Sequence, residues 1–292
     1  MTFNQFWQPL AQVCDEHEAK SIARLVMDIG FGLSTADIVM GRVETLEDTA
    51  LRTIRQRLLK GEPVQYVLGK AEFGNLLFRV DSHVLIPRPE TLWLCTAVCQ
   101  DIADTPCSVL DIGTGSGCIA VTIAHERPTA QVTAWDISDG ALGVARQNAE
   151  KNGVNIDFKH QDALCPPDDH DLWHAIVSNP PYICRQEEKA MECNVLDHEP
   201  HLALFVPDDD PLLFYRSIAR YAVNALKPGG TLYLEINPLY AAPLSDLLTE
   251  TGFCRVSIRQ DDYGKDRYAL AWKDDDGADN GDNNALNDKK DT

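Results

Sequence analysis

A glycine-rich turn near the middle of the chain has the residue types and spacing of a site that holds a small ligand. It reads Asp111-Ile112-Gly113-Thr114-Gly115-Ser116-Gly117. Glycine lets the backbone turn sharply and approach a ligand with no Cβ in the way, and the helix that follows offers free N–H groups. The spacing disfavours both the dinucleotide fingerprint and the P-loop. A tight strand–helix turn without function is the simpler alternative.

Two aspartates follow the next two apolar runs. Asp136 ends the run 131–136, and Asp162 follows the run 156–160. An acid at the end of the second strand of a doubly wound sheet is placed to accept both hydroxyls of a ribose. Either aspartate alone is typical of a loop or a helix cap. Together with the glycine turn they predict one ligand crevice at successive strand ends.

A second polar motif, Asn179-Pro180-Pro181-Tyr182, follows the apolar run 175–178. Two consecutive prolines lack N–H donors and hold a rigid extended turn. The amide oxygen of Asn179 and the carbonyl of Pro180 can therefore both face outward and accept the two hydrogens of one planar –NH2 group, while Tyr182 covers its face. A nitrogen held in this way can aim its lone pair at an electrophile. The alternative is a proline turn without chemistry.

The motifs sit in a repeating pattern of strands and helices. Short apolar runs predict strands, and amphipathic 3.6-residue patterns predict helices between them. The alternation predicts an α/β fold with a doubly wound, mostly parallel, seven-stranded sheet. The predicted strands are 108–112, 131–136, 156–160, 175–178, 231–236, 256–259 and 268–272; the predicted helices are 91–102, 118–125, 141–152, 212–226 and 239–251.

The first 60 residues predict a separate unit of about four helices, with Ser34 and Asp37 forming a capped helix start. The stretch from Arg52 to Lys60 is basic, which suits either a grip on a protein substrate or an ordinary solvated helix face. Residues 61–90 predict a β-hairpin linker, in which 64–86 alternate as strands and Asp81-Ser82 forms the turn.

The charge balance excludes some partners. The chain has 26 Lys and Arg against 45 Asp and Glu, a net charge of −19. Such a chain repels phosphate backbones and anionic membranes, so stable nucleic-acid or membrane binding is not expected. Residues 273–292 carry seven Asp and three Lys and almost nothing apolar, which predicts a disordered acidic tail.

The nine cysteines contain no Cys-x-x-Cys pair, so neither a zinc knuckle nor a thioredoxin-type motif is indicated, and reduced packing cysteines are expected. His198 and His201 lack a nearby third ligand, and we predict no metal site. The chain opens with no basic-then-apolar signal segment and has no apolar run long enough to span a bilayer. These features predict a cytoplasmic protein; they do not indicate its oligomeric state.

The two motifs in this order resemble the class I S-adenosylmethionine-dependent methyltransferases that act on an amide or amino nitrogen. More narrowly, the chain resembles the HemK-like release-factor glutamine N5-methyltransferases from about Ala11 to Trp272. Further segments carry this resemblance: Gly61-Glu62-Pro63-Val64-Gln65-Tyr66, Leu85-Ile86-Pro87-Arg88-Pro89-Glu90-Thr91, His198-Glu199-Pro200, Glu235-Ile236-Asn237 and Gly264-Lys265-Asp266-Arg267. The order of helical domain, hairpin linker and methyltransferase domain is also that of the family.

The resemblance implies that S-adenosyl-L-methionine is the cofactor and that the substrate is the glutamine of the Gly-Gly-Gln motif in peptide chain release factors. It implies a substrate-recognition domain at 1–60 and a Rossmann-like methyltransferase domain at 91–272. The implied catalytic residues are Asn179, Pro180, Pro181 and Tyr182. The implied cofactor-binding residues are Asp111, Gly113, Thr114, Gly115, Ser116, Gly117, Asp136, Asp162 and Asn179.

Two positions depart from the family pattern. Leu92-Trp93 stands where Pro-Glu-Thr commonly continues with another Glu, and Ala163 stands where an aromatic contact to adenine is frequent. Both departures concern cofactor packing or substrate choice more than the type of reaction.

Three other functions remain open from the sequence. A ribosomal-protein glutamine methyltransferase would carry the same motifs. A DNA adenine-N6 methyltransferase would hold an exocyclic amine in the same way, but it needs phosphate contacts that the charge disfavours. A non-enzymatic cofactor-binding scaffold is disfavoured by the intact acceptor motif.

Overall fold

The C-terminal domain is built on one seven-stranded sheet. The computed structural model describes residues 1–102, 106–191 and 193–275. The strands are β3 (Cys107–Ile112), β4 (Ala130–Asp136), β5 (Ile156–His160), β6 (Trp173–Ser178), β9 (Leu226–Glu235), β10 (Arg255–Gln260) and β11 (Asp266–Trp272). Their order is β10-β11-β9-β6-β3-β4-β5, and only β11 runs antiparallel to its neighbours. The predicted doubly wound, mostly parallel sheet is confirmed.

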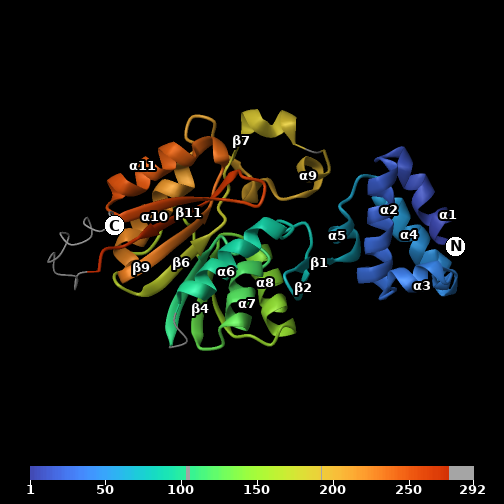
Figure 1. Ribbon diagram of the computed structural model, residues 1–292, viewed down its shortest axis with the longest axis horizontal. Helices are drawn as coiled ribbons and strands as arrows, with labels where there is room; N and C mark the ends of the chain where they lie inside the picture. The colour runs from blue at the N-terminus through green and yellow to red at the C-terminus, as the bar shows by residue number, and fades with distance from the viewer. Residues whose placement is uncertain (103–105, 192, 276–292) are drawn as a thin grey trace, which may run out of the picture.

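Helices cover both faces of this sheet (Figure 1). One face carries α6 (Leu92–Asp101), α7 (Cys118–Glu126) and α8 (Asp139–Lys151), and the other carries α10 (Leu213–Ala225) and α11 (Ala241–Thr251). Neighbouring residues of a strand enter different cores, as Val109 and Leu110 of β3 do. This alternation of side chains is the reason why the strands read as continuous apolar runs.

The strand order reverses between β3 and β6. The chain passes from β3 to β4 and β5 on one side, and then returns to place β6 on the other side of β3. In doubly wound sheets a ligand crevice opens at this point, beyond the carboxyl ends of the strands. The glycine turn follows β3 and the Asn-Pro-Pro-Tyr motif follows β6, so the topology brings both motifs to the same crevice.

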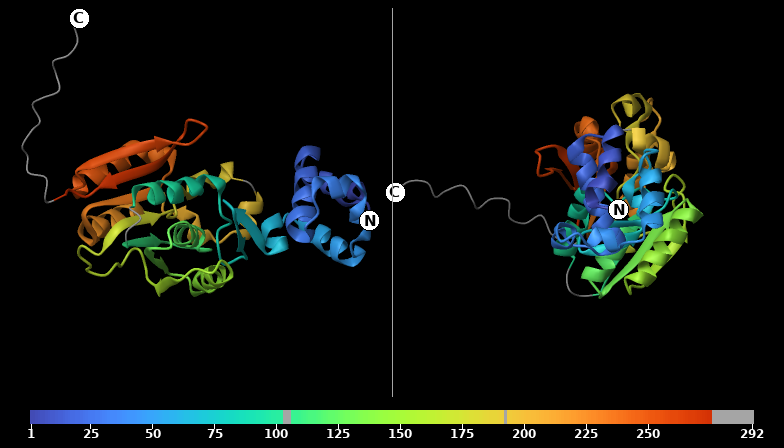
Figure 2. Two further views of the ribbon diagram at one scale, coloured as in Figure 1. Left: turned by 60° about the horizontal axis from the view of Figure 1, so that its bottom comes forward. Right: turned by 90° about the vertical axis from the view of Figure 1, so that its right-hand side faces the viewer.

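The N-terminal helices form a separate unit at one end of the molecule (Figure 2). They are α1 (Phe3–Trp7), α2 (Glu16–Leu25), α3 (Thr35–Val39) and α4 (Asp48–Leu58), with a π-helical turn at Val26–Gly30. Their buried core includes Phe6, Leu10, Met27 and Leu51. Ser34 caps α3 through a reciprocal bond with Asp37, as the sequence predicts.

The basic stretch of α4 is mostly bound to the unit itself. Arg52 pairs with Asp48, Arg55 Nη1 donates to the carbonyl of Gln5 at 2.7 Å, and Arg57 pairs with Glu62. These contacts favour a structural role for the three arginines over a free basic surface.

The linker differs from its prediction. A short helix, α5 (Val64–Leu68), precedes the hairpin, whose strands are β1 (Lys70–Phe73) and β2 (Leu76–Arg79). A turn does form at the predicted Asp81-Ser82, where the N–H of Val84 donates to the carbonyl of Asp81 at 3.1 Å, but it lies after the hairpin. The hairpin itself turns at Gly74-Asn75, where Gly74 has a φ of +57°. The alternating apolar residues beyond the hairpin, Val80, Val84 and Ile86, pack against α8 without pairing as a strand.

The hairpin is anchored in the core of the C-terminal domain through Phe78, which is fully buried. We expect Phe78→Ala to lower the free energy of unfolding by about 3–5 kcal/mol, because it removes a large side chain from a packed core. Urea unfolding measures this loss. Glu72→Ala on the exposed side of β1 is the control and should change stability by less than about 0.5 kcal/mol. Equal stability of the two variants would contradict the anchoring role.

The segment between β6 and α10 contains short elements that the sequence analysis missed: β7 (Ile183–Cys184), α9 (Cys193–His198) and β8 (Phe205–Val206). Short 3-10 helices occupy Gln8–Gln12, Arg42–Thr45, Pro89–Thr91, Arg185–Ala190, His201–Ala203 and Pro238–Tyr240. The predicted tail lies outside the described residues from 276 onward. Within the described parts of the chain, no helix has the length and apolar character needed to cross a bilayer.

Candidate active site

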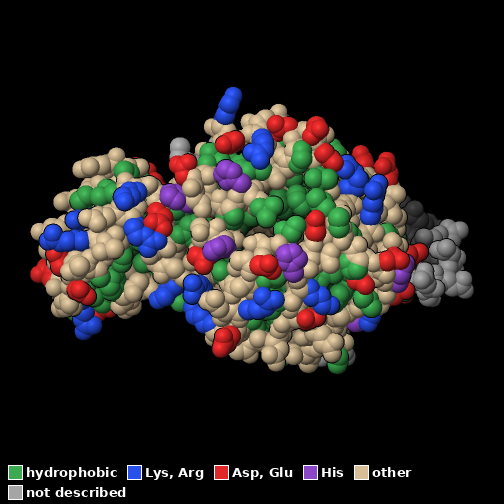
Figure 3. All heavy atoms as spheres, turned by 180° about the vertical axis from the view of Figure 1, so that it is seen from behind, with side chains coloured by type: hydrophobic (Ala, Val, Ile, Leu, Met, Phe, Trp, Pro, Cys, Tyr) green, Lys and Arg blue, Asp and Glu red, His purple; other side chains and the backbone are tan. Residues whose placement is uncertain are grey.

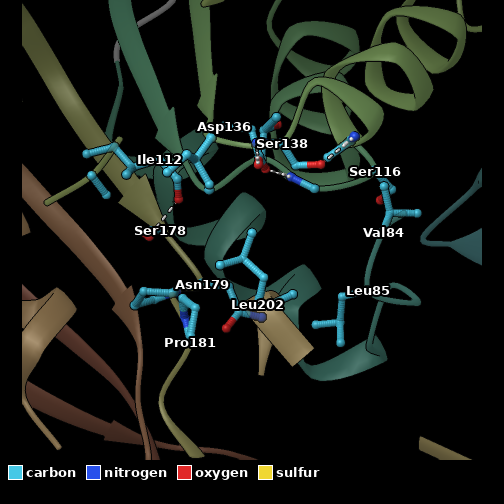
Figure 4. A pocket seen from close by; sticks show the side chains of 18 of the residues that line it. Val84, Leu85, Ile112, Ser116, Asp136, Ser138, Ser178, Asn179, Pro181 and Leu202 are labelled. Carbon is cyan, nitrogen blue, oxygen red and sulfur yellow. Dashed lines mark hydrogen bonds between the residues drawn. The ribbon is translucent and has the colours of Figure 1, made fainter. Parts of the chain in front are cut away.

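An open cavity lies at the carboxyl ends of β3, β4 and β6 (Figure 4). Its empty space, including the open mouth, is about 1250 Å³. The predicted residues that line it are Gly113, Thr114, Gly115, Ser116, Asp136, Asp162, Asn179, Pro180 and Pro181. In Figure 4, Asp136 and Ser138 lie on one side of the cavity, and Asn179 and Pro181 lie on another. The cavity therefore extends from the glycine turn to the Asn-Pro-Pro-Tyr motif.

The glycine turn forms part of the cavity wall. Gly113, Gly115 and Gly117 have φ values of +74°, +53° and +80°, a region that favours glycine. A Cβ on Gly113 or Gly115 would meet no protein atom within 4 Å, whereas one on Gly117 would lie 3.1 Å from the Cβ of Ala145. The first two glycines therefore leave room in the cavity, and Gly117 allows α7 and α8 to pack closely.

Asp136 presents its carboxylate to the cavity in a fixed orientation. Its Oδ2 accepts the N–H of Gly115 at 2.8 Å, and its Oδ1 accepts the N–H of Ser138 at 2.9 Å. Burial raises the pKa of Asp136, and these two backbone donors oppose the shift. A carboxylate oxygen has two acceptor positions, so Asp136 keeps acceptor capacity for a ligand hydroxyl beside these backbone donors.

The wall near Asp162 includes residues that the sequence analysis missed. Asp162 Oδ1 accepts the N–H of Leu164 at 2.8 Å, and the carbonyl of Ala163 accepts the hydroxyl of Ser217 at 2.6 Å. This second bond ties the loop to α10, whose Phe214 also lines the cavity. An aromatic side chain thus reaches the wall from another element, although position 163 is alanine. No local pattern distinguishes Phe214 from a core residue.

Asp111 lies behind the turn and is not among the residues that line the cavity. It is fully buried, and its Oδ2 accepts the Thr114 hydroxyl at 2.7 Å and the Ala120 N–H at 3.2 Å. Its Oδ1 has no hydrogen-bond partner in the described chain. The residue therefore holds the glycine turn against the start of α7. Burial raises the pKa of Asp111 to about 7.

This shift predicts a pH-dependent stability. Between pH 4 and 7 the unfolded chain has lost the Asp111 proton while the folded chain retains it, so the free energy of unfolding falls as the pH rises. The slope that Asp111 contributes is at most about 1.4 kcal/mol per pH unit. Asp111→Asn should remove that contribution, and urea unfolding of both proteins from pH 5 to 7.5 measures it. A stability difference that does not change over this range would contradict the assignment.

The acceptor motif is tied to its surroundings at both ends. Before it, the Ser178 hydroxyl donates to the carbonyl of Ile112 at 2.7 Å, which joins the ends of β6 and β3. Within it, Asn179 Nδ2 donates to Thr91 Oγ1 at 3.3 Å. Tyr182 is not among the residues that line the cavity, and its hydroxyl donates to Glu235 Oε1 at 3.1 Å. The stacking of Tyr182 on a substrate amide therefore stays a prediction.

The proline-rich segment before α6 closes another side of the cavity. Leu85, Pro87 and Arg88 line it, and Arg88 Nη2 pairs with Glu199 at 2.6 Å. Glu199 also accepts the N–H of Ile86 at 3.2 Å, and its side chain is only 1% exposed. The structure thus pairs Arg88 with a buried acid and also places it on the cavity wall.

These features fit the donor implied by the resemblance. The remaining acceptor capacity of the Asp136 carboxylate suits a ribose hydroxyl. The open space at Gly113 and Gly115 suits close approach of a ligand to the backbone. Among the described residues, no group of three or more His, Cys, Asp or Glu has the arrangement of a metal site.

Comparisons with known proteins agree with this geometry. The family named Methyltransferase small domain matches residues 95–198. The release factor glutamine methyltransferase of Bacteroides thetaiotaomicron is 42% identical over 90% of this chain and 96% of its own length. The chain belongs to the release factor glutamine methyltransferase family. The family member from Flavobacterium psychrophilum is 39% identical over 90% of this chain and 95% of its own length.

A solved structure supports the fold of this family member independently. The methyltransferase from Pyrococcus furiosus superposes with a TM-score of 0.52 at 17% identity, covering 75% of this chain and 98% of its own. At that identity the likeness concerns the fold alone. Its relatives and the matching family, rather than this likeness, make the chain an S-adenosylmethionine-dependent methyltransferase, as the sequence analysis predicts.

Proposed function

We infer that this chain transfers a methyl group from S-adenosylmethionine to the side-chain amide nitrogen of the glutamine in the Gly-Gly-Gln motif of peptide chain release factors. The observation that carries this proposal is the position of Asn179 and Pro180 on the wall of the same cavity as Asp136 and the glycine turn. The names of the relatives support release factors as the substrate.

In this proposal the acceptor motif binds the amide. Asn179 Oδ1 and the Pro180 carbonyl accept its two N–H hydrogens, while Pro181 keeps the turn rigid. A primary amide is a poor nucleophile because its lone pair is conjugated with the carbonyl. Two fixed acceptors hold the nitrogen in place as it rehybridises toward the donor, so positioning supplies much of the rate.

The bound cofactor supplies an already activated methyl group, so the reaction needs no nucleophilic side chain. Asp136 would hold the ribose, Gly113 and Gly115 would leave room for the methionine part, and Asp162 would lie near the adenine. We assign no general base, because the N–H proton becomes acidic only as the new bond forms and can leave to water.

Apolar residues at the cavity offer a surface for the protein substrate. Ile137, Leu164 and Leu202 line the cavity and remain 43%, 38% and 59% exposed. Figure 3 shows hydrophobic side chains gathered in the middle of one face of the C-terminal domain, with charged and histidine side chains around them. We propose that the substrate loop contacts this surface and that the helical unit 1–60 helps to recognise the substrate.

Methyl transfer from labelled S-adenosylmethionine tests the proposal. A bacterial release factor should gain one methyl group on the Gly-Gly-Gln peptide, which mass spectrometry locates, and a Gly-Gly-Glu variant of that factor should gain none. Label on a ribosomal protein or on DNA in place of the release factor would assign one of the other functions. Absence of label on all three substrates would contradict the proposed methyl transfer.

A further inference from the structure

The side-chain amide of Asn179 has two nearly isosteric ends, and only its oxygen can accept hydrogens from a substrate. The proposed function therefore requires contacts that keep the side-chain nitrogen of Asn179 turned away from the cavity. Asn179 Nδ2 lies 3.3 Å from Thr91 Oγ1, and Thr91 Oγ1 lies 2.6 Å from Glu235 Oε2. Thr91 and Glu235 are 2% and 1% exposed, so the bond between them is shielded from water, whereas the bond between Asn179 and Thr91 is partly buried at the cavity wall.

The tertiary structure brings the three residues together from distant parts of the chain. Ser178 of β6 pairs with Leu234 of β9, so the next residues, Asn179 and Glu235, are neighbours at the strand ends. Thr91 immediately precedes α6, at the end of the proline-rich segment.

The chemistry of the three groups sets a direction. Burial raises the pKa of the Glu235 carboxyl, and the hydrogen bonds that Thr91 and Tyr182 donate to it oppose that shift. The ionised carboxylate only accepts hydrogen bonds, so Thr91 donates its single hydroxyl hydrogen to Glu235. Thr91 Oγ1 then has only lone pairs left for Asn179, and these select the –NH2 end of the amide. The other oxygen of Glu235 accepts from the Tyr182 hydroxyl. One carboxylate therefore contacts the end of the acceptor motif directly and its start, Asn179, through Thr91.

We propose that Thr91 and Glu235 are positioning residues that fix the Asn179 amide with its nitrogen toward Thr91 and its oxygen toward the cavity. The orientation stands on the geometry alone, whereas its effect on catalysis rests on the proposed function.

The kinetic test compares two substitutions at position 91. Thr91→Val keeps the shape but removes the hydroxyl, and it should lower kcat for release-factor methylation about 10- to 100-fold, as expected when a reacting group is misplaced. The dissociation constant for S-adenosylmethionine should stay within about twofold: of the residues implied for the cofactor, Thr91 bonds Asn179, which the proposed function assigns to the substrate amide. Thr91→Ser restores the hydroxyl and should restore most of kcat. Thr122→Val is the matched control, because Thr122 is a buried threonine whose hydroxyl has no partner in the described chain.

A wild-type kcat for Thr91→Val, or an equal loss in Thr91→Ser, would overturn the proposal. A readout without turnover separates it from the proposed function: the NMR signals of the Asn179 side-chain –NH2, identified by their absence in Asn179→Asp. They should exchange slowly with solvent in wild type and Thr122→Val and rapidly in Thr91→Val. If this holds while no release factor is methylated, the orientation stands and the proposed function fails. Unchanged exchange in Thr91→Val overturns the orientation.

Discussion

Asn179→Ala should reduce the turnover of release-factor methylation by about 10- to 1,000-fold, by analogy with the loss of one oriented hydrogen-bonding group from a reacting centre. The variant loses one of the two acceptors for the substrate amide, while Pro180 keeps the other. Asn179 lies well apart from Asp136 in the cavity, so the affinity for S-adenosylmethionine should stay close to that of wild type. Steady-state kinetics with a release factor measures kcat, and calorimetry measures cofactor binding.

The control is Asn224→Ala, which removes an exposed asparagine at the far end of α10 and should leave both quantities unchanged. Wild-type turnover of Asn179→Ala would exclude its role as an acceptor. A loss of cofactor affinity together with the loss of turnover would instead assign Asn179 to the cofactor site, a role that the resemblance also implies for it.

Asp136→Ala should weaken binding of S-adenosylmethionine by about 1–3 kcal/mol, because two ribose hydroxyls lose their acceptors. The substitution also releases the N–H groups of Gly115 and Ser138, so part of the loss comes from a less ordered glycine turn. Calorimetric titration of the cofactor into the free enzyme measures the change directly.

Asp139→Ala removes an equal charge three residues later, from a side chain that is 85% exposed and faces His160. It should bind the cofactor as wild type does, which separates a specific contact from a general charge effect. An unchanged dissociation constant in Asp136→Ala would remove the ribose contact from the proposal.

The elements that carry the motifs were predictable because their signals are local. Strand β5 has the predicted limits, and the ends of β3, β4 and β6 differ by two residues or fewer. Alternating burial on two sheet faces and glycine turns leave their pattern directly in the sequence. The order of strands, helices and turns then placed the two motifs at one edge of the sheet.

The linker could not be predicted in this way, because its apolar residues contact other elements. Val80, Val84 and Ile86 alternate like a strand, yet they pack against α8. Helix α5 is too short to be stable alone, and Arg57 of α4 supports it by donating to the carbonyls of Val67 and Tyr66.

By itself, the sequence determined the fold class and the residues that could bind a nucleoside and an amide, since both depend on residue type and near-neighbour spacing. Only the tertiary structure decided which of them line the cavity: Asp111 and Tyr182 are not among the lining residues, while Phe214 and Leu202 join them from other elements. It also decided that Thr91 and Glu235 meet Asn179, because hydrogen bonds join atoms that are close in space, and chain order alone does not specify those distances.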